Sequence, residues 1–419
     1  MKGLVILLLF LEPLLSGAVT NYDSYKVYQV TPQSMDEALA LKTFENNGYF
    51  DFWSSLRSVG APVDIMVNPI AQDMFEDFLQ NYNIKYDVLI ENVQETINKN
   101  VQGRSSTRAV EQGQVSFTEF MRYDEITAYL QQLAADYPSI VTTEVVGQSF
   151  EGRDISLIRI SSGGTNKTTI FAEATIHARE WIAPPVALYV ISQLVENSEN
   201  AYMYEDVDWA IIPVANPDGY EYTHTDTRLW RKTRTPGTIC YGVDPNRNFD
   251  YNWNVIGASS WQCDETYAGY IPFSEQETQA IRDYTLAHKD DIKLYLAIHS
   301  YGQWMLYPWG HTTEGPEDEE ELIALGELFR DAIYAVNGTE YVVNSTAKGL
   351  YYAAGTSIDW AKAVAGIDLS YTIELPGGGS AGFDIPAERI ESVVEETWEG
   401  FKVLHDYIQR KFNDTDTDN

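Results

Sequence analysis

Two of the six histidines directly follow apolar runs of the kind that form buried strands. His177 follows residues 169–176 and lies three positions before Glu180, and His299 follows residues 294–298. Because ligands of open α/β sheets gather where strands end, these side chains can face one point. Two imidazoles and one carboxylate give zinc three protein ligands and leave a fourth position for water, which is typical of a catalytic site. On this spacing alone, packed structural histidines remain the more frequent explanation.

The elements around these histidines alternate between short apolar runs and amphipathic stretches. This alternation predicts an α/β domain with a mixed, mostly parallel sheet flanked by helices. The strand-like runs are residues 155–160, 169–174, 210–214, 294–298 and 369–373, and the helical patterns are residues 185–195 and 274–288.

Residues 24–95 predict a separate, smaller unit that contains no histidine and no cysteine. Its elements follow the order strand, helix, two strands, helix, strand, which is typical of a ferredoxin-like α+β unit. The clearest strands are residues 25–30, 63–67 and 86–90, and the amphipathic stretches are residues 35–46 and 70–80.

A polar segment, residues 94–114, follows this unit and has little apolar periodicity. Such a composition predicts a linker between two domains. The segment contains Arg104 and Arg108, and an exposed loop with two arginines is also what a trypsin-like protease would cut. An ordinary inter-domain linker is the alternative.

The N-terminus and the overall charge indicate the compartment and exclude two kinds of partner. Lys2, the apolar run 4–11 and the small residues 16–18 predict a signal peptide at residues 1–18, and therefore a secreted protein. The formal net charge of -34 argues against nucleic acid and anionic membranes as partners. The only two cysteines, Cys240 and Cys263, most simply form one disulfide in an exported chain.

Four further segments occur downstream of the stretch Ile-His-Ala-Arg-Glu-Trp, and they decide the interpretation. They are residues 227–232 (Thr-Arg-Leu-Trp-Arg-Lys), 240–248, 350–360 and 371–375 (Tyr-Thr-Ile-Glu-Leu). In this order and spacing the chain resembles the A/B-type zinc metallocarboxypeptidases of digestive origin, and it is closest to the A-type. The resemblance covers essentially the whole chain. It implies a signal peptide at 1–18, an activation propeptide at 19–108 and a catalytic domain at 109–419.

The resemblance assigns the metal site residue by residue. His177, Glu180 and His299 match the family's ligands for one zinc ion per chain, a set of two histidines and one glutamate that is well established for catalytic zinc. Asp244 matches the carboxylate that orients a ligand histidine. A turn aspartate before Pro245 is the alternative for Asp244.

Two further residues match the family's catalytic groups. Glu374 matches the glutamate expected to take a proton from the zinc-bound water and pass it to the leaving amine. Arg231 matches the residue that stabilises the oxyanion formed at the scissile carbonyl. Without the resemblance, Glu374 is equally consistent with a solvated strand-end glutamate, and Arg231 with a surface arginine.

A third group of residues matches the family's substrate-binding residues. Asn246, Arg247 and Tyr351 match the residues that hold the substrate's free C-terminal carboxylate, for which the arginine fork is well suited. This group makes the predicted enzyme an exopeptidase. Arg179 and Tyr301 match residues of the outer subsites, with an ordinary surface role as the alternative.

The pocket for the terminal residue decides between the A-type and the B-type. The B-type carries an acid at the pocket floor, whereas this chain has Ile358 there. Ala353, Leu306 and Gly310 match the pocket wall and add no charge, so the expected preference is for apolar or aromatic termini. A slip of one residue would place Asp359 at the floor and favour basic termini instead.

The resemblance also implies a disulfide pairing and a site of proteolytic activation. Cys240 and Cys263 match the family disulfide, and cleavage after Arg104 or Arg108, with Arg108 favoured, would release activity. The implied partners are peptide and protein C-termini and an activating trypsin-like protease, with a monomer as the default. A non-catalytic relative is the remaining alternative, but such a chain would lack a zinc ligand or the catalytic glutamate.

Overall fold

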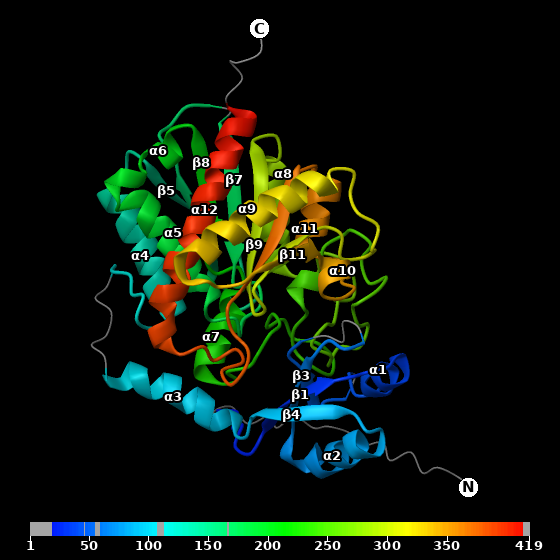
Figure 1. Cartoon of the computed structure of the whole chain (residues 1–419). Coiled ribbons are helices and arrows are strands. Elements are labelled where there is room, and N and C mark those ends of the chain that lie inside the picture. The colour runs from blue at the N-terminus through cyan, green and yellow to red at the C-terminus, as the bar shows by residue number, and fades with distance from the viewer. Residues whose placement is uncertain (1–18, 46, 55–58, 107–112, 166, 414–419) are drawn as a thin grey trace.

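A computed structural model of the chain describes residues 19–413 apart from residues 46, 55–58, 107–112 and 166. The predicted signal peptide at 1–18 and the predicted cleavage residue Arg108 therefore lie outside the described residues. The described strands form two sheets, one of four strands and one of eight strands. Figure 1 shows the smaller sheet, in blue, below the larger one.

The four-stranded sheet belongs to the N-terminal unit and confirms the predicted ferredoxin-like order. Its strands are arranged β2-β3-β1-β4, and all neighbours are antiparallel. Apolar side chains from the strands and both helices, among them Phe50, Leu41 and Phe75, form its core. The elements are β1 (Lys26–Thr31), α1 (Met35–Lys42), β2 (Phe50–Phe52), β3 (Val63–Val67), α2 (Gln72–Asn81) and β4 (Lys85–Ile90).

The segment after this unit differs from the prediction. We expected a linker from residue 94 onward, but helix α3 (Val93–Ser106) occupies its first part and contains Arg104. Val93 and Ile97, four residues apart, lie on one face of the helix and are buried against Tyr22 and Ile90. These two residues pack α3 against the rest of the unit. Apolar residues recur at positions 93, 97 and 101, but polar residues and glycine fill the rest of the helix, and this composition favoured a linker.

The eight-stranded sheet has the order β11-β10-β12-β9-β7-β8-β6-β5. Its centre, β12-β9-β7-β8, is parallel throughout, whereas β10 pairs antiparallel with β12 and β6 pairs antiparallel with β8 and β5. The mixed, mostly parallel prediction is therefore confirmed. The strands are β5 (Val141–Gln148), β6 (Asp154–Ile160), β7 (Thr168–Ala174), β8 (Val207–Ile212), β9 (Ile292–Ser300), β10 (Trp304–Tyr307), β11 (Val342–Ser345) and β12 (Leu369–Leu375).

Helices cover both faces of this sheet. Alternate residues of β9 belong to two different apolar cores, because successive side chains of a strand point to opposite faces. Helices α4, α5, α9 and α12 contribute to the first core, and α8 and α11 contribute to the second. The helices are α4 (Tyr123–Asp136), α5 (Ala183–Val195), α6 (Tyr202–Glu205), α7 (Pro217–Thr225), α8 (Gln276–Ala287), α9 (Glu319–Asn337), α10 (Thr346–Gly349), α11 (Ser357–Trp360) and α12 (Ile390–Phe412).

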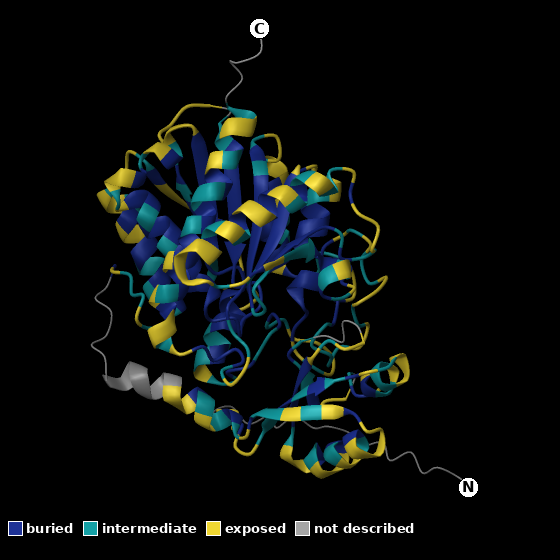
Figure 2. Cartoon of the chain, in the orientation of Figure 1, coloured by how far each residue is buried: buried dark blue, intermediate teal, exposed yellow. Residues whose placement is uncertain are grey.

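Burial follows this layering. Figure 2 shows the central strands of the larger sheet in dark blue and the outward sides of the flanking helices in yellow. Every residue of β7 and β8 is buried, as expected for strands with a helix layer on each side. Among the described residues, no helix combines the length and the apolar character needed to cross a bilayer.

Candidate metal centre and active site

Three side chains converge at the carboxyl ends of β7 and β9. Nitrogen and oxygen atoms of His177, Glu180 and His299 all lie within 4.8 Å of one another, and the three residues are buried. The turn after β7 includes Thr175, whose φ of 61° is unusual for a β-branched residue. Its hydroxyl donates to the carbonyl of Pro213 at 2.9 Å, which holds this turn in place. The structure thus brings the three predicted ligands together.

The spacing of these atoms fits a small divalent cation. Nδ1 of His177 lies 2.8 Å from Oε1 of Glu180, Nδ1 of His299 lies 3.0 Å from Oε2 of Glu180, and the two Nδ1 atoms are 3.1 Å apart. Zinc ligands at about 2.0–2.1 Å from the metal, in a tetrahedral arrangement, are about 3.3 Å from one another. Within the described residues this is the one group of histidines, cysteines and acids that could hold a metal ion.

Asp244 connects the metal centre to Arg231. Nε2 of His177 donates to Oδ1 of Asp244 at 3.0 Å, and the guanidinium of Arg231 donates to Oδ2 at 2.9 and 3.2 Å. Burial alone would raise the pKa of Asp244, but Arg231 and His177 hold the pKa well below its usual range. The ionised carboxylate keeps the hydrogen of His177 on Nε2, so the Nδ1 lone pair is available to a metal.

Glu374 lies beside His299 because two strands pair in register. In the parallel pairing of β12 with β9, Glu374 is opposite His299 and Leu375 is opposite Ser300. Glu374 is partly exposed, whereas the other residues of β12 are buried. A carboxylate therefore stands next to the metal centre at the more accessible end of a buried strand.

Asn246, Arg247 and Tyr351 gather on another side of the centre. Oδ1 of Asn246 accepts the N–H of Ser357 at 2.9 Å, and its Nδ2 lies 3.4 Å from Nε2 of His299. The guanidinium of Arg247 uses two of its five N–H groups on the carbonyls of Gly257 and Asn246, at 2.7 and 2.8 Å. It also lies 5.6 Å from the ring centre of Tyr351. This fixed, buried fork is suited to an anionic group.

The residues expected to form the pocket lie on three neighbouring segments. Ile358 is buried on α11. The carboxylate of the next residue, Asp359, accepts the N–H of Gly310 at 3.0 Å and lies 3.0 Å from Nδ1 of His311. The carbonyl of Gly310 in turn accepts the N–H of Ala353 at 2.8 Å. The wall residue Leu306 is buried on β10.

The N-terminal unit contacts the segments that follow β7, β9 and β12. Asp51 bonds to Arg179, which follows β7, and Asp64 accepts the hydroxyl of Tyr301, which follows β9, at 3.0 Å. Trp53 packs edge-on against Phe383, which lies beyond β12 and also contacts Tyr301 and Arg179. The unit thus covers both predicted outer-subsite residues.

Several of these contact residues were not anticipated from the sequence. Asp51, Trp53, Asp64 and Phe383 were not among the candidates. Asp64 gave the clearest signal, because it is an acid within an otherwise apolar strand and its burial requires a partner. The hydroxyl of Tyr301 is one such partner.

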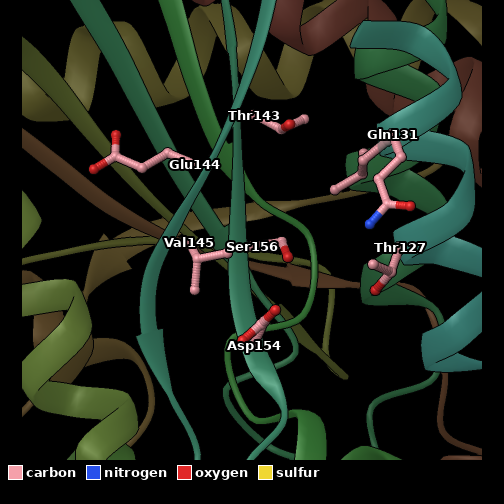
Figure 3. Close-up of a pocket in the computed structure, with 8 residues that line it drawn as sticks. Thr127, Gln131, Thr143, Glu144, Val145, Asp154 and Ser156 are labelled. Carbon is pink, nitrogen blue, oxygen red and sulfur yellow. The ribbon is translucent and has the colours of Figure 1, made fainter. Parts of the chain in front are cut away.

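The remaining predicted features have clear positions in the fold. Cys240 and Cys263 form a disulfide, with their Cα atoms 5.1 Å apart. A small pocket of about 80 Å³, shown in Figure 3, lies between α4 and the strands β5 and β6, which carry none of the site residues. Its lining includes Glu144 and Asp154 and none of the predicted site residues.

Comparison with known proteins identifies the class to which this zinc-type ligand set and the docked N-terminal unit belong. Residues 126–400 match the zinc carboxypeptidase family, and residues 28–100 match the carboxypeptidase activation peptide. The chain belongs to the zinc carboxypeptidase family, and its cofactor is zinc.

Named relatives and a solved structure show the same similarity. The chain is 44% identical over 306 residues to carboxypeptidase B of Astacus astacus, covering 71% of this chain and 100% of that protein. It is 37% identical to zinc carboxypeptidase A 1 of Drosophila melanogaster, covering 91% of each chain. The crystal structure of carboxypeptidase A from Helicoverpa armigera superposes with a TM-score of 0.87 at 35% identity, covering 93% of this chain and 99% of that one.

Proposed function

We propose that this zinc carboxypeptidase is a secreted precursor that, once its N-terminal unit is removed, releases single apolar or aromatic residues from peptide C-termini. The proposed parts are a signal peptide at 1–18, a propeptide at 19–108 and a catalytic domain at 109–419. Cleavage after Arg108, or within α3 after Arg104, would separate the last two. The observation that carries the preference is Ile358, an apolar side chain where an acid would be needed for basic termini.

Three residues would hold the substrate by its C-terminal carboxylate. Arg247 supplies a two-pronged donor, and Asn246 and Tyr351 stand beside it. An internal peptide bond offers no carboxylate at this point, so the buried guanidinium would stay without an anionic partner. This requirement favours exopeptidase action.

Two residues would act on the scissile bond. Zinc, held by His177, Glu180 and His299, would supply Lewis-acid polarisation and a nucleophile at neutral pH. Glu374, next to His299, would accept a proton from the attacking water and donate one to the leaving amine. Arg231, fixed by Asp244, would stabilise the negative charge that develops on the carbonyl oxygen.

A preference for basic termini is the competing assignment, because relatives named carboxypeptidase A and carboxypeptidase B are both similar to this chain. The first test is release of C-terminal Phe against Arg from blocked dipeptides by trypsin-treated protein, with and without a zinc chelator, beside Glu374→Gln. Chelator-sensitive release of Phe, missing in the variant, supports the proposal. Preferential release of Arg overturns the pocket assignment, and no release from either peptide favours a non-catalytic relative.

A further inference from the structure

One charged group lies directly beside the apolar pocket floor. Asp359 follows Ile358 on α11 and is fully buried, with none of its surface exposed. Burial raises the pKa of Asp359, while hydrogen bonds from His311 and Gly310 lower it. An ionised carboxylate beside the pocket for the terminal side chain would favour lysine or arginine unless its oxygens were hydrogen-bonded and directed elsewhere.

His311 supplies hydrogen bonds that can hold the carboxylate in this way. Its Nδ1 lies 3.0 Å from Oδ2 of Asp359, and its backbone N–H lies 3.4 Å from the same oxygen. The imidazole packs against two aromatic rings that also contact each other, with centroid distances of 5.2 Å to Tyr251 and 5.4 Å to Trp309. The ring therefore has a fixed position from which to hold the carboxylate.

The same pair connects two sides of the pocket. His311 follows the wall residue Gly310, and Asp359 follows the floor residue Ile358. Gly310 donates to both oxygens of Asp359 at 3.0 Å and accepts from Ala353 at 2.8 Å. Loss of the imidazole would leave the buried carboxylate with the backbone N–H groups of residues 310 and 311 as its donors.

We propose that His311 is a specificity-determining residue that holds Asp359 by hydrogen bonds and orients it away from the terminal side chain, so that the pocket accepts apolar residues. The inference rests on the proposed preference and names the residue that maintains it. His311 acts through Asp359 and is therefore a positioning residue rather than a catalytic one.

The test compares kcat/KM for blocked dipeptides ending in Phe and in Lys, using trypsin-treated, zinc-loaded protein. His311→Phe keeps the ring packing but removes the Nδ1 donor, and we expect the Phe-to-Lys ratio to fall by about 10-fold or more. His311→Asn places an amide nitrogen near the position of Nδ1 and should keep the ratio within about threefold of the wild type. His288→Phe, the same change outside the site, should leave the ratio unaltered.

The double variant His311→Phe/Asp359→Asn identifies the mechanism, because removal of the charge should restore the preference for Phe. An unchanged ratio in His311→Phe, or an equal fall in the double variant, overturns the proposal. If His311→Phe does not fold, as judged by thermal unfolding, His311→Leu takes its place in both comparisons. A wild type that itself prefers Lys or Arg contradicts the proposed function, and this result is distinct from a Phe-specific wild type whose variants do not change.

Discussion

Nη1 of Arg179 donates to the carboxylate of Asp51 at 2.8 Å, and this bond joins the catalytic domain to the N-terminal unit. Arg179 is 2% exposed and Asp51 is 17% exposed, so water screens the pair only weakly. The apolar cluster around it contains Trp53 and Phe383, one from each part of the chain. The two predicted outer-subsite residues, Arg179 and Tyr301, are therefore covered by side chains of the N-terminal unit.

Asp51→Asn should make the uncleaved protein more active. The change leaves Arg179 buried without its nearest charged partner, which typically costs about 2–5 kcal/mol, and should weaken docking of the N-terminal unit. We expect activity before trypsin treatment to rise by about 10-fold or more, with unchanged activity afterwards. Asp23→Asn, an exposed acid of the same unit, is the matched control. Equal activity of the two uncleaved variants would contradict the role given to Asp51.

Glu374→Gln should remove catalysis without removing the metal. An amide cannot accept the proton, and loss of a general base typically lowers kcat by about 10²–10⁴-fold. KM and zinc content should change little, because the three predicted ligands are untouched. The checks are steady-state kinetics and metal analysis, with Glu340→Gln on the surface as the control. A variant that retains more than a tenth of wild-type kcat rules out this role for Glu374.

Zinc should stabilise the fold as well as support the reaction. A ligand that binds the native state adds about 4 kcal/mol to the free energy of unfolding at a concentration about 1,000 times its Kd. We expect chelation to lower the midpoint of thermal unfolding and one equivalent of zinc to restore both midpoint and activity. His299→Ala should show no comparable shift. A midpoint insensitive to zinc in the wild type would argue against these ligands.

Glu277 should make the fold less stable as pH rises through the range between 4.5 and about 8. Burial, together with the neighbouring charge of Glu275, raises the pKa of Glu277 from 4.5 to about 8. Between these values the unfolded chain has lost the proton that the folded chain keeps, so the free energy of unfolding falls as pH rises. The fall is roughly 1.4 kcal/mol per pH unit within the window.

Glu277→Gln removes this titration. Its free energy of unfolding should therefore gain on that of the wild type from about pH 5 to about pH 8, as measured by urea unfolding at each pH. Glu388→Gln, on the exposed surface, should run parallel to the wild type. Parallel curves for Glu277→Gln as well would refute the assignment.

Sequence patterns anticipated the centre of the molecule better than its boundaries. The apolar runs that precede His177 and His299 are local features of the sequence, and the parallel pairing of β7 with β9 brings the two residues together. Helix α3 was missed because its mostly polar composition outweighed the apolar residues at positions 93, 97 and 101.

Contacts between segments that are distant in the sequence could not be predicted from the sequence patterns either. Asp51 and Arg179 are 128 residues apart, and His311 and Asp359 are 48 apart. Such pairs depend on how domains and loops dock, which periodicity does not encode. The resemblance supplied roles for site residues, but it gave no partner for Asp359.

The register that sets Glu374 beside His299 is maintained by the backbone ladder of two buried strands. Ile358, His311 and Tyr351, by contrast, lie on a short helix and on connecting segments. Proteins that inherit this sheet can therefore exchange residues around the pocket and change their substrate preference while Glu374 stays aligned with His299. Evolutionary change in selectivity should be concentrated in these connections and spare the strands.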